Sequence, residues 1–275
     1  MALYLGNNSI TKAYLGGNEV SQMYQGTTSL LPTGPAGFPV TRGLRTVYDF
    51  SDTNSYPGTG TTVYDISGNG FDGSLHGSTT LTTDYGGGFG VGKQTNQGLW
   101  MNGNNCESSG ELTLCFAWDP GVRPDPYAFG RMWSGTNRTT PDGGGSYNSV
   151  SLEIRSNNPA PAAQDWYQDQ WGQSRVSTNI GATGGVQIIG NKMSKTGTTA
   201  GDWELYKNGS SIANGNSANA DYKTFNDFLT LGNRGDWNGE NVPGNYFMCH
   251  IFDTYLTDAE MTTWYNFYKS RFSLT

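Results

Sequence analysis

Short apolar runs separated by turn-forming residues occupy most of the chain beyond residue 40. Glycine occurs 40 times in 275 residues, about twice its average usage, and charged residues are scarce. Short apolar runs separated by turn-forming residues are typical of a many-stranded antiparallel fold. It predicts an all-β protein with strands at 47–50, 112–118, 149–154, 186–189, 203–206, 228–231 and 246–252.

Two stretches show which residues should face a core. In residues 112–118 the even positions carry large apolar side chains and leave Thr113 and Ala117 on the other face, as expected for a strand with one inward face. Near the C-terminus, Thr257 and Glu260 have the spacing of a capping box. The sequence predicts one amphipathic helix there that covers a sheet edge, and its apolar face comprises Met261, Trp264, Tyr265 and Tyr268.

The first thirty residues contain a repeat with a period of ten. A tyrosine and a following glycine recur in each unit, and an aliphatic residue comes four positions after the glycine. Each unit predicts a strand, a turn with Gly or Asn, and a short second strand. The residues that we expect to make contacts are Tyr4, Leu5, Ile10, Tyr14, Leu15, Val20, Tyr24 and Leu30.

Three such units are too short to bury a core of their own, so their apolar side chains need another surface. We expect a docking or oligomerisation role, and the alternative is that the units add edge strands to the following domain. Residues 32–39 are rich in Pro and Gly and are predicted to form a linker. The predicted organisation is a β-repeat segment at 1–31, a linker at 32–39 and a β-sandwich at 40–275.

Two family resemblances refine these expectations. The repeat resembles the Tyr-Leu-Gly units near the ends of many tailed-bacteriophage virion proteins. Residues 64–73, YDISGNGFDG, are similar to an Asp-x-Ser-Gly-Asn-Gly-x-Asp-Gly turn of the concanavalin A-like, laminin G-like family. The hairpin at 203–209, with a type I′ turn at Asn208 and Gly209, and the closing run from Leu231 to Glu260 also resemble that family. The resemblance implies a jelly-roll β-sandwich over residues 44–272, from which the segment 119–173 departs by its long loops.

Charge and targeting features narrow the partners. A net charge of −7 with scattered Lys and Arg opposes binding to nucleic acid or to anionic membranes. The start of the sequence lacks the features of a signal peptide, and no stretch is long and apolar enough to span a bilayer. We therefore expect synthesis in a host cytoplasm without membrane insertion. Cys106, Cys115 and Cys249 are expected to be buried thiols.

A calcium site is the first chemistry to consider. Asp65, Ser67, Asn69 and Gly70 follow the order of an EF-hand loop, but His76 stands where the bidentate Glu is required. The same residues suit turns in which the carboxylates accept backbone N–H groups. Some members of the jelly-roll family bind calcium, and Asp65, Asn69 and Asp72 are the candidate ligands here. We expect no metal and no other cofactor.

Catalytic patterns are missing from the sequence. Sandwich-type glucanases carry paired carboxylates at alternating positions of one strand, whereas Glu153 stands alone in its predicted strand. Asp165, Asp169, Asp236 and Glu240 lie in sequence that we predict as loops. The two histidines are His76 and His250, and the latter lies in an apolar strand as a solvent-facing or a hydrogen-bonded core residue.

Aromatic residues flanked by amides and carboxylates form a candidate glycan site. Such side chains stack on sugar rings and bond their hydroxyls, and the alternative is that the rings pack loops or line a protein interface. The candidate residues are Trp166, Tyr167, Trp171, Asp236, Trp237 and Asn238.

The sequence as a whole favours a non-enzymatic virion structural protein, namely a capsid decoration, head-fibre or tail-associated protein on the virion surface. Its expected partners are other virion proteins of the capsid or tail and further copies of itself, with a trimer implied by resemblance to fibre proteins. Adhesion to host surface glycans is compatible with this role. The alternatives are a polysaccharide-binding adhesin and a polysaccharide-degrading enzyme on the same fold.

Overall fold

The computed structural model divides the chain into two units, residues Met1–Arg42 and Gly43–Thr275. The predicted ends of the repeat segment at residue 31 and of the linker at residue 39 remain predictions. The structure describes residues 4–5, 8–9, 14–15, 18–19, 24–25, 28–29, 37–92, 97–102, 111–121, 130–136, 150–155, 165–170, 178–179, 185–196, 200–217, 228–233 and 242–275.

The N-terminal unit contains three separate two-stranded hairpins, one in each ten-residue repeat. The first strand of each hairpin carries the repeated tyrosine, and only two residues connect it to the second strand. The pairs are β1 (Tyr4–Leu5) with β2 (Asn8–Ser9), β3 (Tyr14–Leu15) with β4 (Asn18–Glu19), and β5 (Tyr24–Gln25) with β6 (Thr28–Ser29). The predicted arrangement of strand, turn and strand is therefore confirmed at the strands.

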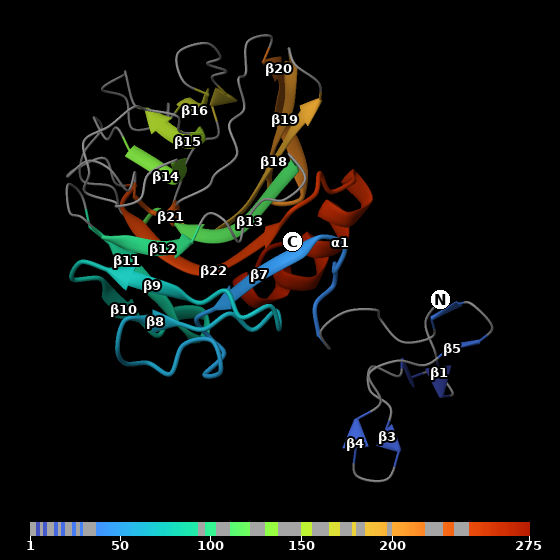
Figure 1. The fold of residues 1–275 in the computed structure, drawn as a ribbon. Helices are drawn as coiled ribbons and strands as arrows, with labels where there is room; N and C mark the ends of the chain where they lie inside the picture. The colour runs from blue at the N-terminus through green and yellow to red at the C-terminus, as the bar shows by residue number, and fades with distance from the viewer. Residues whose placement is uncertain are drawn as a thin grey trace. The chain divides into compact units, whose positions relative to one another are not determined.

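The second unit is a sandwich of two antiparallel sheets with eight strands each (Figure 1). The first sheet has the order β10-β11-β22-β13-β18-β19-β20, and β7 pairs with β22. Its strands are β7 (Leu44–Asp49), β10 (Thr80–Thr82), β11 (Gly88–Val91), β13 (Glu111–Asp119), β18 (Gln187–Thr196), β19 (Ala200–Lys207), β20 (Ser210–Ser217) and β22 (Gly244–Phe252).

The second sheet has the order β17-β16-β15-β14-β21-β12-β9-β8. Its strands are β8 (Thr62–Val63), β9 (Gly73–His76), β12 (Gly98–Asn102), β14 (Gly130–Thr136), β15 (Val150–Arg155), β16 (Asp165–Gln170), β17 (Thr178–Asn179) and β21 (Phe228–Leu231). A short 3-10 helix, η1 (Asp84–Gly86), precedes β11, and another, η3 (Lys269–Phe272), directly follows the C-terminal helix. The predicted all-β, jelly-roll-like sandwich is confirmed.

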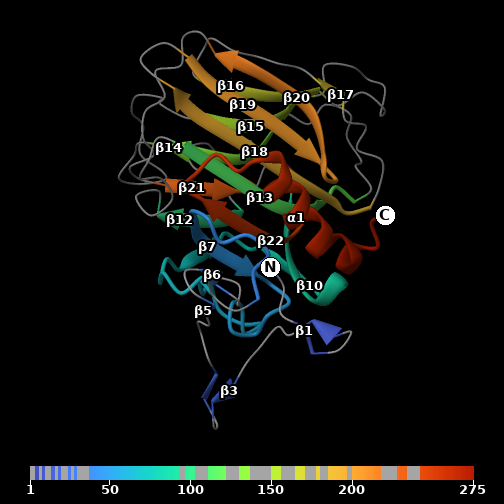
Figure 2. The ribbon, with the colours of Figure 1, turned by 90° about the vertical axis from the view of Figure 1, so that its right-hand side faces the viewer.

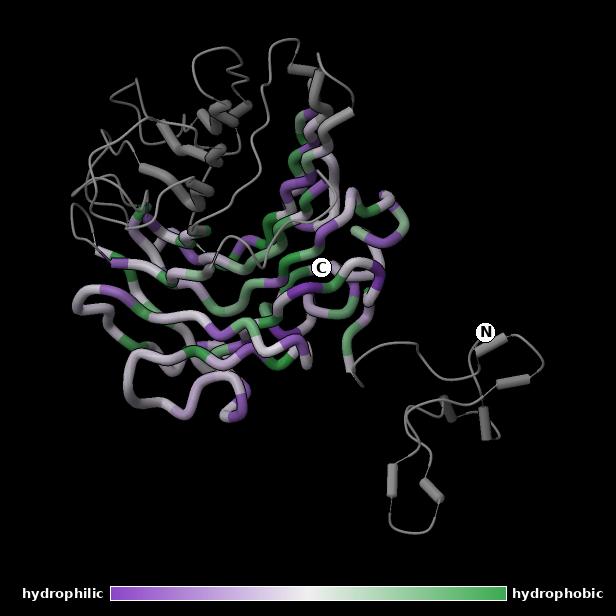
Figure 3. The backbone as a smooth tube through the Cα atoms, viewed as in Figure 1, coloured by the Kyte–Doolittle hydropathy of each residue, from purple (hydrophilic) through white to green (hydrophobic). Residues whose placement is uncertain are grey.

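The core fills the space between the sheets. Leu114, Phe116 and Trp118 of β13 are fully buried there and belong to the same apolar cluster as Leu99 of β12 and Leu231 of β21. Figure 3 shows hydrophobic residues concentrated along β13 and β22, the central strands of the first sheet. The alternation predicted for residues 112–118 is therefore correct.

The C-terminal helix α1 (Asp258–Tyr268) begins with the predicted capping box. The hydroxyl of Thr257 accepts a hydrogen bond from the backbone N–H of Glu260, whose side chain accepts one from the backbone N–H of Thr257. The predicted apolar face is buried. These two hydrogen bonds satisfy N–H groups at the start of the helix that have no partner within the helix.

The helix covers a face of the first sheet, and the prediction that it covers an edge is wrong. It lies across β13, β18 and β22 (Figure 2). Met261 reaches Cys115 of β13 and the backbone of Gly190 of β18, and Trp264 packs edge-on against His250 of β22. The small residues Cys115 and Gly190 leave room for the helix, which explains why the middle of the sheet is its docking place.

The segment 119–173 contains the predicted strand at 149–154 as β15, and also β14 and β16, which were not predicted. The stretch from Asp165 to Gln170, predicted as a loop, is a strand paired with β15 in the register Val150 to Gln170 and Arg155 to Asp165. Its aromatic pair has high β propensity, and pairing with a neighbour outweighs the polar residues around it.

The hairpin between β19 and β20 follows the predicted turn chemistry. Lys207 pairs with Ser210, so that Asn208 and Gly209 form the two-residue loop. Both have positive φ angles, 48° and 79°, as a type I′ turn requires. The side chain of Tyr265 lies directly against Gly209, where an added Cβ would come within 2.5 Å of the ring. Helix α1 therefore packs on this turn as well.

Candidate functional site

The Asp-x-Ser-Gly-Asn-Gly turn holds its carboxylate against the backbone. Asp65 Oδ1 accepts hydrogen bonds from the backbone N–H groups of Val47 and Ser67, both at 2.9 Å. Its Oδ2 accepts from the hydroxyl of Ser67 at 2.8 Å and from the N–H of Phe71 at 3.1 Å. The Asp65 carboxylate therefore has four protein donors around its two oxygens.

The other two candidate calcium ligands also bond the backbone. Asp72 Oδ1 accepts from the backbone N–H of Asp65 at 2.9 Å, and the Asn69 amide donates to the carbonyls of Leu44 and Arg45. The turn interpretation of these residues is confirmed, since Asp65 and Asn69 fasten the 64–73 loop to β7 and Asp72 bonds the backbone within the loop. Within the described residues, no group of three or more His, Cys, Asp or Glu side chains forms a metal-binding cluster.

The predicted glycan residues are only in part within the described residues. Trp166 and Tyr167 are successive residues of β16, and they pair with Ile154 and Glu153 of β15. Trp171, Asp236, Trp237 and Asn238 lie outside the described residues. The grouping of the six residues therefore stays a prediction.

The predicted docking residues lie in the hairpins. Tyr4, Leu5, Tyr14, Leu15 and Tyr24 belong to the first strands of the three hairpins. Ile10, Val20 and Leu30 each follow a second strand directly in the sequence, outside the described residues. Each predicted residue thus lies in or next to a strand pair of only two residues per strand.

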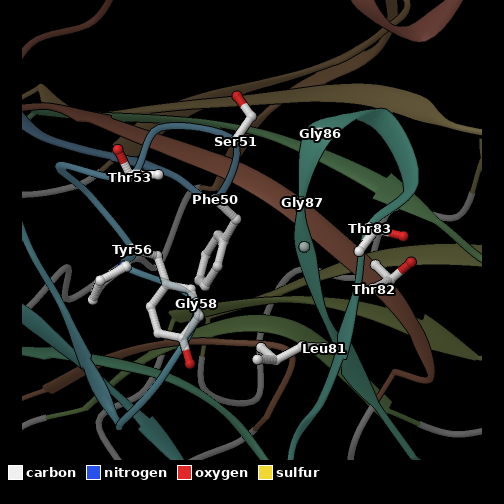
Figure 4. Close-up of a pocket in the computed structure, with 12 residues that line it drawn as sticks. Phe50, Ser51, Thr53, Tyr56, Gly58, Leu81, Thr82, Thr83, Gly86 and Gly87 are labelled. Carbon is white, nitrogen blue, oxygen red and sulfur yellow. The ribbon is translucent and has the colours of Figure 1, made fainter.

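A hollow of 260 Å³ opens between the loop after β7 and the segment that joins β10 to β11 (Figure 4). Phe50, Tyr56 and Leu81 contribute apolar surface to its wall. The nearby polar groups are already engaged, because the Tyr56 hydroxyl donates to the carbonyl of Gly60 at 2.9 Å and the Thr82 hydroxyl donates to Asp84 at 2.9 Å. The residues that line it include no carboxylate, imidazole or thiol.

A buried lysine of the first sheet contacts the start of α1. The side chain of Lys192 in β18 is 1 % exposed, and its Nζ lies 2.6 Å from Glu204 Oε2 and 2.8 Å from Asp258 Oδ1. The hydroxyl of Tyr206 lies 3.1 Å from the same Nζ and donates to Asp258 Oδ1 at 2.7 Å. The ring of Tyr255 covers Nζ at 4.7 Å. We call Lys192, Glu204, Tyr206, Tyr255 and Asp258 the lysine cluster.

Strand register assembles this cluster. Lys192 is directly opposite Glu204 in the pairing of β18 with β19, and Tyr206 is opposite Gly190. Residues at alternating positions of paired strands share a face. Asp258, the first residue of α1, contacts Lys192 on this face. A salt bridge of this kind joins the sheet to the helix.

The electrostatics of the cluster follow from these contacts. The hydrogen bonds from Lys192 and Tyr206, together with the lysine charge, lower the pKa of the Asp258 carboxyl. Burial, the hydrogen bond to Asp258 and the nearby carboxylates raise the pKa of the Tyr206 hydroxyl. The tyrosine therefore remains a hydrogen-bond donor at neutral pH, and the aspartate remains an acceptor.

His250 of β22 lies on the same covered face of the sheet, and β13 separates its strand from that of Lys192. Burial under α1 lowers its pKa from 6.5 to about 4, and its ring packs edge-on against Trp264 and Tyr268 at 5.4 and 5.1 Å. It is a neutral core residue at neutral pH, which removes the solvent-facing interpretation. Cys115 and Cys249 are free and buried as predicted, and Cys106 lies outside the described residues.

The lysine cluster was not predicted from the sequence. Its signal was a lysine inside the apolar run 186–194 and a Glu-x-Tyr pair in the strand 203–206. Buried lysines are rare unless they are paired, so the partner had to be sought in a neighbouring strand. The sequence does not reveal which strand that is, because β13 and β19 both pair with β18.

Comparison with known proteins finds similarity at the level of structure only. No family model matches the sequence, and no curated protein matches it. Among solved structures, the chain is similar to Trypanosoma rangeli sialidase in complex with sialic acid, at 12% identity and a TM-score of 0.57 over 81% of this chain and 32% of that one. The likeness identifies the fold.

A second group of similar structures comes from a toxin. The chain is similar to the receptor binding domain of botulinum neurotoxin D, at 13% identity and a TM-score of 0.57, over 82% of this chain and 52% of that one. The chain thus spans about a third of the sialidase and about half of the toxin domain. At this level of identity the shared property is the β-sandwich itself.

Proposed function

We propose that the chain is a non-enzymatic structural protein of a virus particle, docked by its N-terminal hairpins and displaying the jelly roll on the virion surface. The role would be that of a capsid decoration, head-fibre or tail-associated protein. Other virion proteins and further copies of the chain are its proposed partners. Synthesis in the host cytoplasm and assembly onto the particle complete the proposal.

The hairpins are the observation that carries this proposal. An isolated two-stranded hairpin is marginally stable at best in water, and each of these has strands of two residues. Their repeated tyrosines add large apolar rings that a single hairpin cannot bury. Completion by a neighbouring protein explains why the same unit occurs three times, and the resemblance to virion proteins supplies the kind of neighbour.

The engagement of the described carboxylates supports a non-enzymatic role. Asp65 is saturated by backbone donors, and Asp49 forms a two-oxygen salt bridge with Arg271, 2.9 Å to each oxygen. Glu111 accepts from the backbone N–H of Tyr255 at 2.9 Å. Glycoside hydrolysis needs two carboxyl groups that face a sugar, whereas these three hold loops and the C-terminal segment in place.

Adhesion to host glycans is the proposed activity of the displayed domain. The sialidase complex with sialic acid and the toxin receptor binding domain use the same type of sandwich in proteins that meet sugars or receptors. We assign the contact to Trp166, Tyr167, Trp171, Asp236, Trp237 and Asn238, whose rings and amides suit sugar faces and hydroxyls.

Deletion of residues 1–31 tests the docking role. The truncated protein should remain folded, because the sandwich has its own core, and it should no longer join particles or oligomers. Co-sedimentation with particles, size-exclusion chromatography and circular dichroism measure the three properties. Normal assembly of the truncated protein would contradict the proposal.

Glycan arrays test the adhesion role. Binding should be lost in Trp166→Ala or Trp237→Ala and retained in Phe267→Ala, a matched change of an aromatic residue that is 53% exposed on α1. Release of reducing ends from host envelope polysaccharide would instead support the enzyme alternative. Equal binding by all three variants would remove the assigned site.

A further inference from the structure

The lysine cluster contains the parts of a covalent cross-link. An amine that is almost fully buried touches two carboxylates, Glu204 at 2.6 Å and Asp258 at 2.8 Å. Burying a charged amine destabilises the fold unless its partners are very well placed. A sheet needs no such group to hold a helix, since apolar side chains such as Met261 and Trp264 already do so.

We propose that Lys192 and Asp258 condense spontaneously to an intramolecular isopeptide bond, with Glu204 as the proton carrier. The inference is independent of the proposed virion role. It requires one lysine, one aspartate and one glutamate, all of them within the described sandwich. It is a single modification of the chain by itself, and not turnover of a substrate.

The atoms balance without any further reactant. Glu204 takes one proton from the Lys192 ammonium, 2.6 Å away. The amine lone pair then attacks Cγ of Asp258, so that the Nζ–Cγ bond forms and Oδ1 gains the negative charge. Glu204 passes this proton and a second one from Nζ to Oδ2, the Cγ–Oδ2 bond breaks, and Oδ2 leaves as water while Oδ1 remains as the amide oxygen. Nothing is oxidised or reduced. The ion pair is replaced by a neutral amide.

Three neighbours favour the reaction. Tyr206 donates to Asp258 Oδ1 at 2.7 Å, so it stabilises the negative charge that this oxygen gains when Cγ becomes tetrahedral. Asp258 is the first residue of α1, and the positive end of the helix dipole acts on the same oxygen. Glu204 takes the proton that Nζ must lose and delivers it to the departing oxygen, as a general acid and base.

Burial on one side and exposure on the other give the reaction a direction. The Lys192 side chain is 1 % exposed and lies between the rings of Tyr206 and Tyr255, at 4.8 and 4.7 Å. These rings hold the amine beside the Asp258 carboxyl group, 2.8 Å from Oδ1. The Asp258 side chain is 79 % exposed, which lets the water molecule escape to solvent.

The product would staple the C-terminal helix to the sheet. The two residues are 66 positions apart, so the bond would close a large loop and restrict the unfolded chain as a disulfide does. In a chain with buried free thiols at Cys115 and Cys249, such a bond would supply a cross-link that reducing conditions leave intact.

Mass spectrometry of the full-length protein tests the proposal. The intact mass should be lower than the sequence mass by one water molecule, and a digest should contain one branched peptide that joins Lys192 to Asp258. An intact mass equal to the sequence mass would overturn the proposal and leave the cluster as an ion pair. Loss of water without the branched peptide would overturn it too, because an imide at an Asp-Gly pair loses the same mass.

Variants assign the roles. Lys192→Arg and Asp258→Ala should show the full sequence mass, since neither can form the amide. Glu204→Gln should slow the reaction by roughly 100-fold or more, as loss of a general base does, and leave the lysine and aspartate in place. Asp253→Asn is the control, because Asp253 forms a different surface salt bridge, with Arg45 at 3.5 Å, and it should keep the cross-link. An unchanged mass loss in Lys192→Arg would contradict the assignment, and rapid cross-linking in Glu204→Gln would remove the role of Glu204.

Discussion

The two faces of the first sheet bury their side chains by different means. The inner face of β13 presents Leu114, Phe116 and Trp118 to the second sheet, and all three are fully buried in an apolar cluster. The outer face presents Thr113 and Cys115, which are also 0% exposed, because the segment that leads into α1 covers Thr113 and α1 itself covers Cys115. The same strand is therefore buried on both sides, against a sheet on one and a single helix on the other.

This difference shows that the element packed on a face of the sheet determines which side chains that face can bury. The second sheet offers a wide apolar surface, so the inward-facing positions of the first sheet carry large apolar residues. A helix offers a narrow stripe, so the outer face combines small residues below it with polar groups around it. Lys192 and His250 are both buried on that outer face, and each is stabilised by a particular residue of the helix.

The largest effect is expected from a cavity in the inner face. Phe116→Ala should lower the free energy of unfolding by about 3–5 kcal/mol, because it removes a fully buried ring from a close-packed core. Urea denaturation measures the loss. Phe267→Ala, at an aromatic residue that is half exposed on α1, should stay within about 0.5 kcal/mol. Equal losses in the two variants would contradict the assignment of the core.

Truncation under the helix should act more locally. Trp264→Ala removes a ring that is 1% exposed and that packs on His250 and Tyr268, with an expected cost of about 3 kcal/mol. Hydrogen exchange should rise mainly within α1, whereas the inner-face variant should raise it across the sheets. A uniform rise in the Trp264 variant would show that the helix and the sheet unfold as one unit.

Acid should weaken the outer face through His250. Its pKa is about 4 in the folded protein and about 6.5 in an unfolded chain, so the unfolded state takes up a proton first as the pH falls. Stability should therefore be unaffected above pH 6.5 and should decrease by up to about 3 kcal/mol between pH 6.5 and 4. Denaturation at a series of pH values measures this decrease.

The control for this pH dependence is His250→Leu, which should be nearly flat over the same range. Any remaining loss would come from carboxylates such as Asp258, whose lowered pKa makes its contribution disappear at lower pH. The same slope in both proteins would show that another group senses the acid.

The smallest effect is expected at the helix cap. Thr257→Ala removes the hydroxyl that accepts from the Glu260 N–H at 3.2 Å and should cost about 1 kcal/mol. Thermal unfolding measures it. Thr263→Ala, farther along the exposed side of α1, removes only a bond to the carbonyl of Ala259 and should be close to neutral. The opposite order would contradict the cap assignment.

Local patterns account for the parts that sequence reasoning predicted correctly. The capping box at Thr257 and Glu260, the turn at Asn208 and Gly209, and the hairpins of the ten-residue repeat all depend on residues fewer than ten positions apart. The turn around Asp65 was likewise foreseen as a set of carboxylate bonds to backbone N–H groups. In each case the chemistry of a few neighbours decides the geometry.

The candidate sites show the limit of this approach. The lysine cluster joins Lys192 and Asp258 across 66 positions, and no periodicity connects them. The strand at 165–170 was misread as a loop because its polar residues dominate, although its pairing with β15 decides its conformation. Strand pairing and helix docking are stabilised by contacts between segments that are distant in the sequence, so a local pattern does not reveal them.

By itself the sequence determined the class of fold, the faces of its strands and helix, and the three repeated hairpins, because alternation, caps and turns act over a few residues. Only the tertiary structure decided that α1 lies on the middle of a sheet and that Lys192 meets Glu204 and Asp258. The physical reason is that burial is shared between distant segments. A strand can carry a small residue or a buried charge only where another element fills the space or supplies the opposite charge.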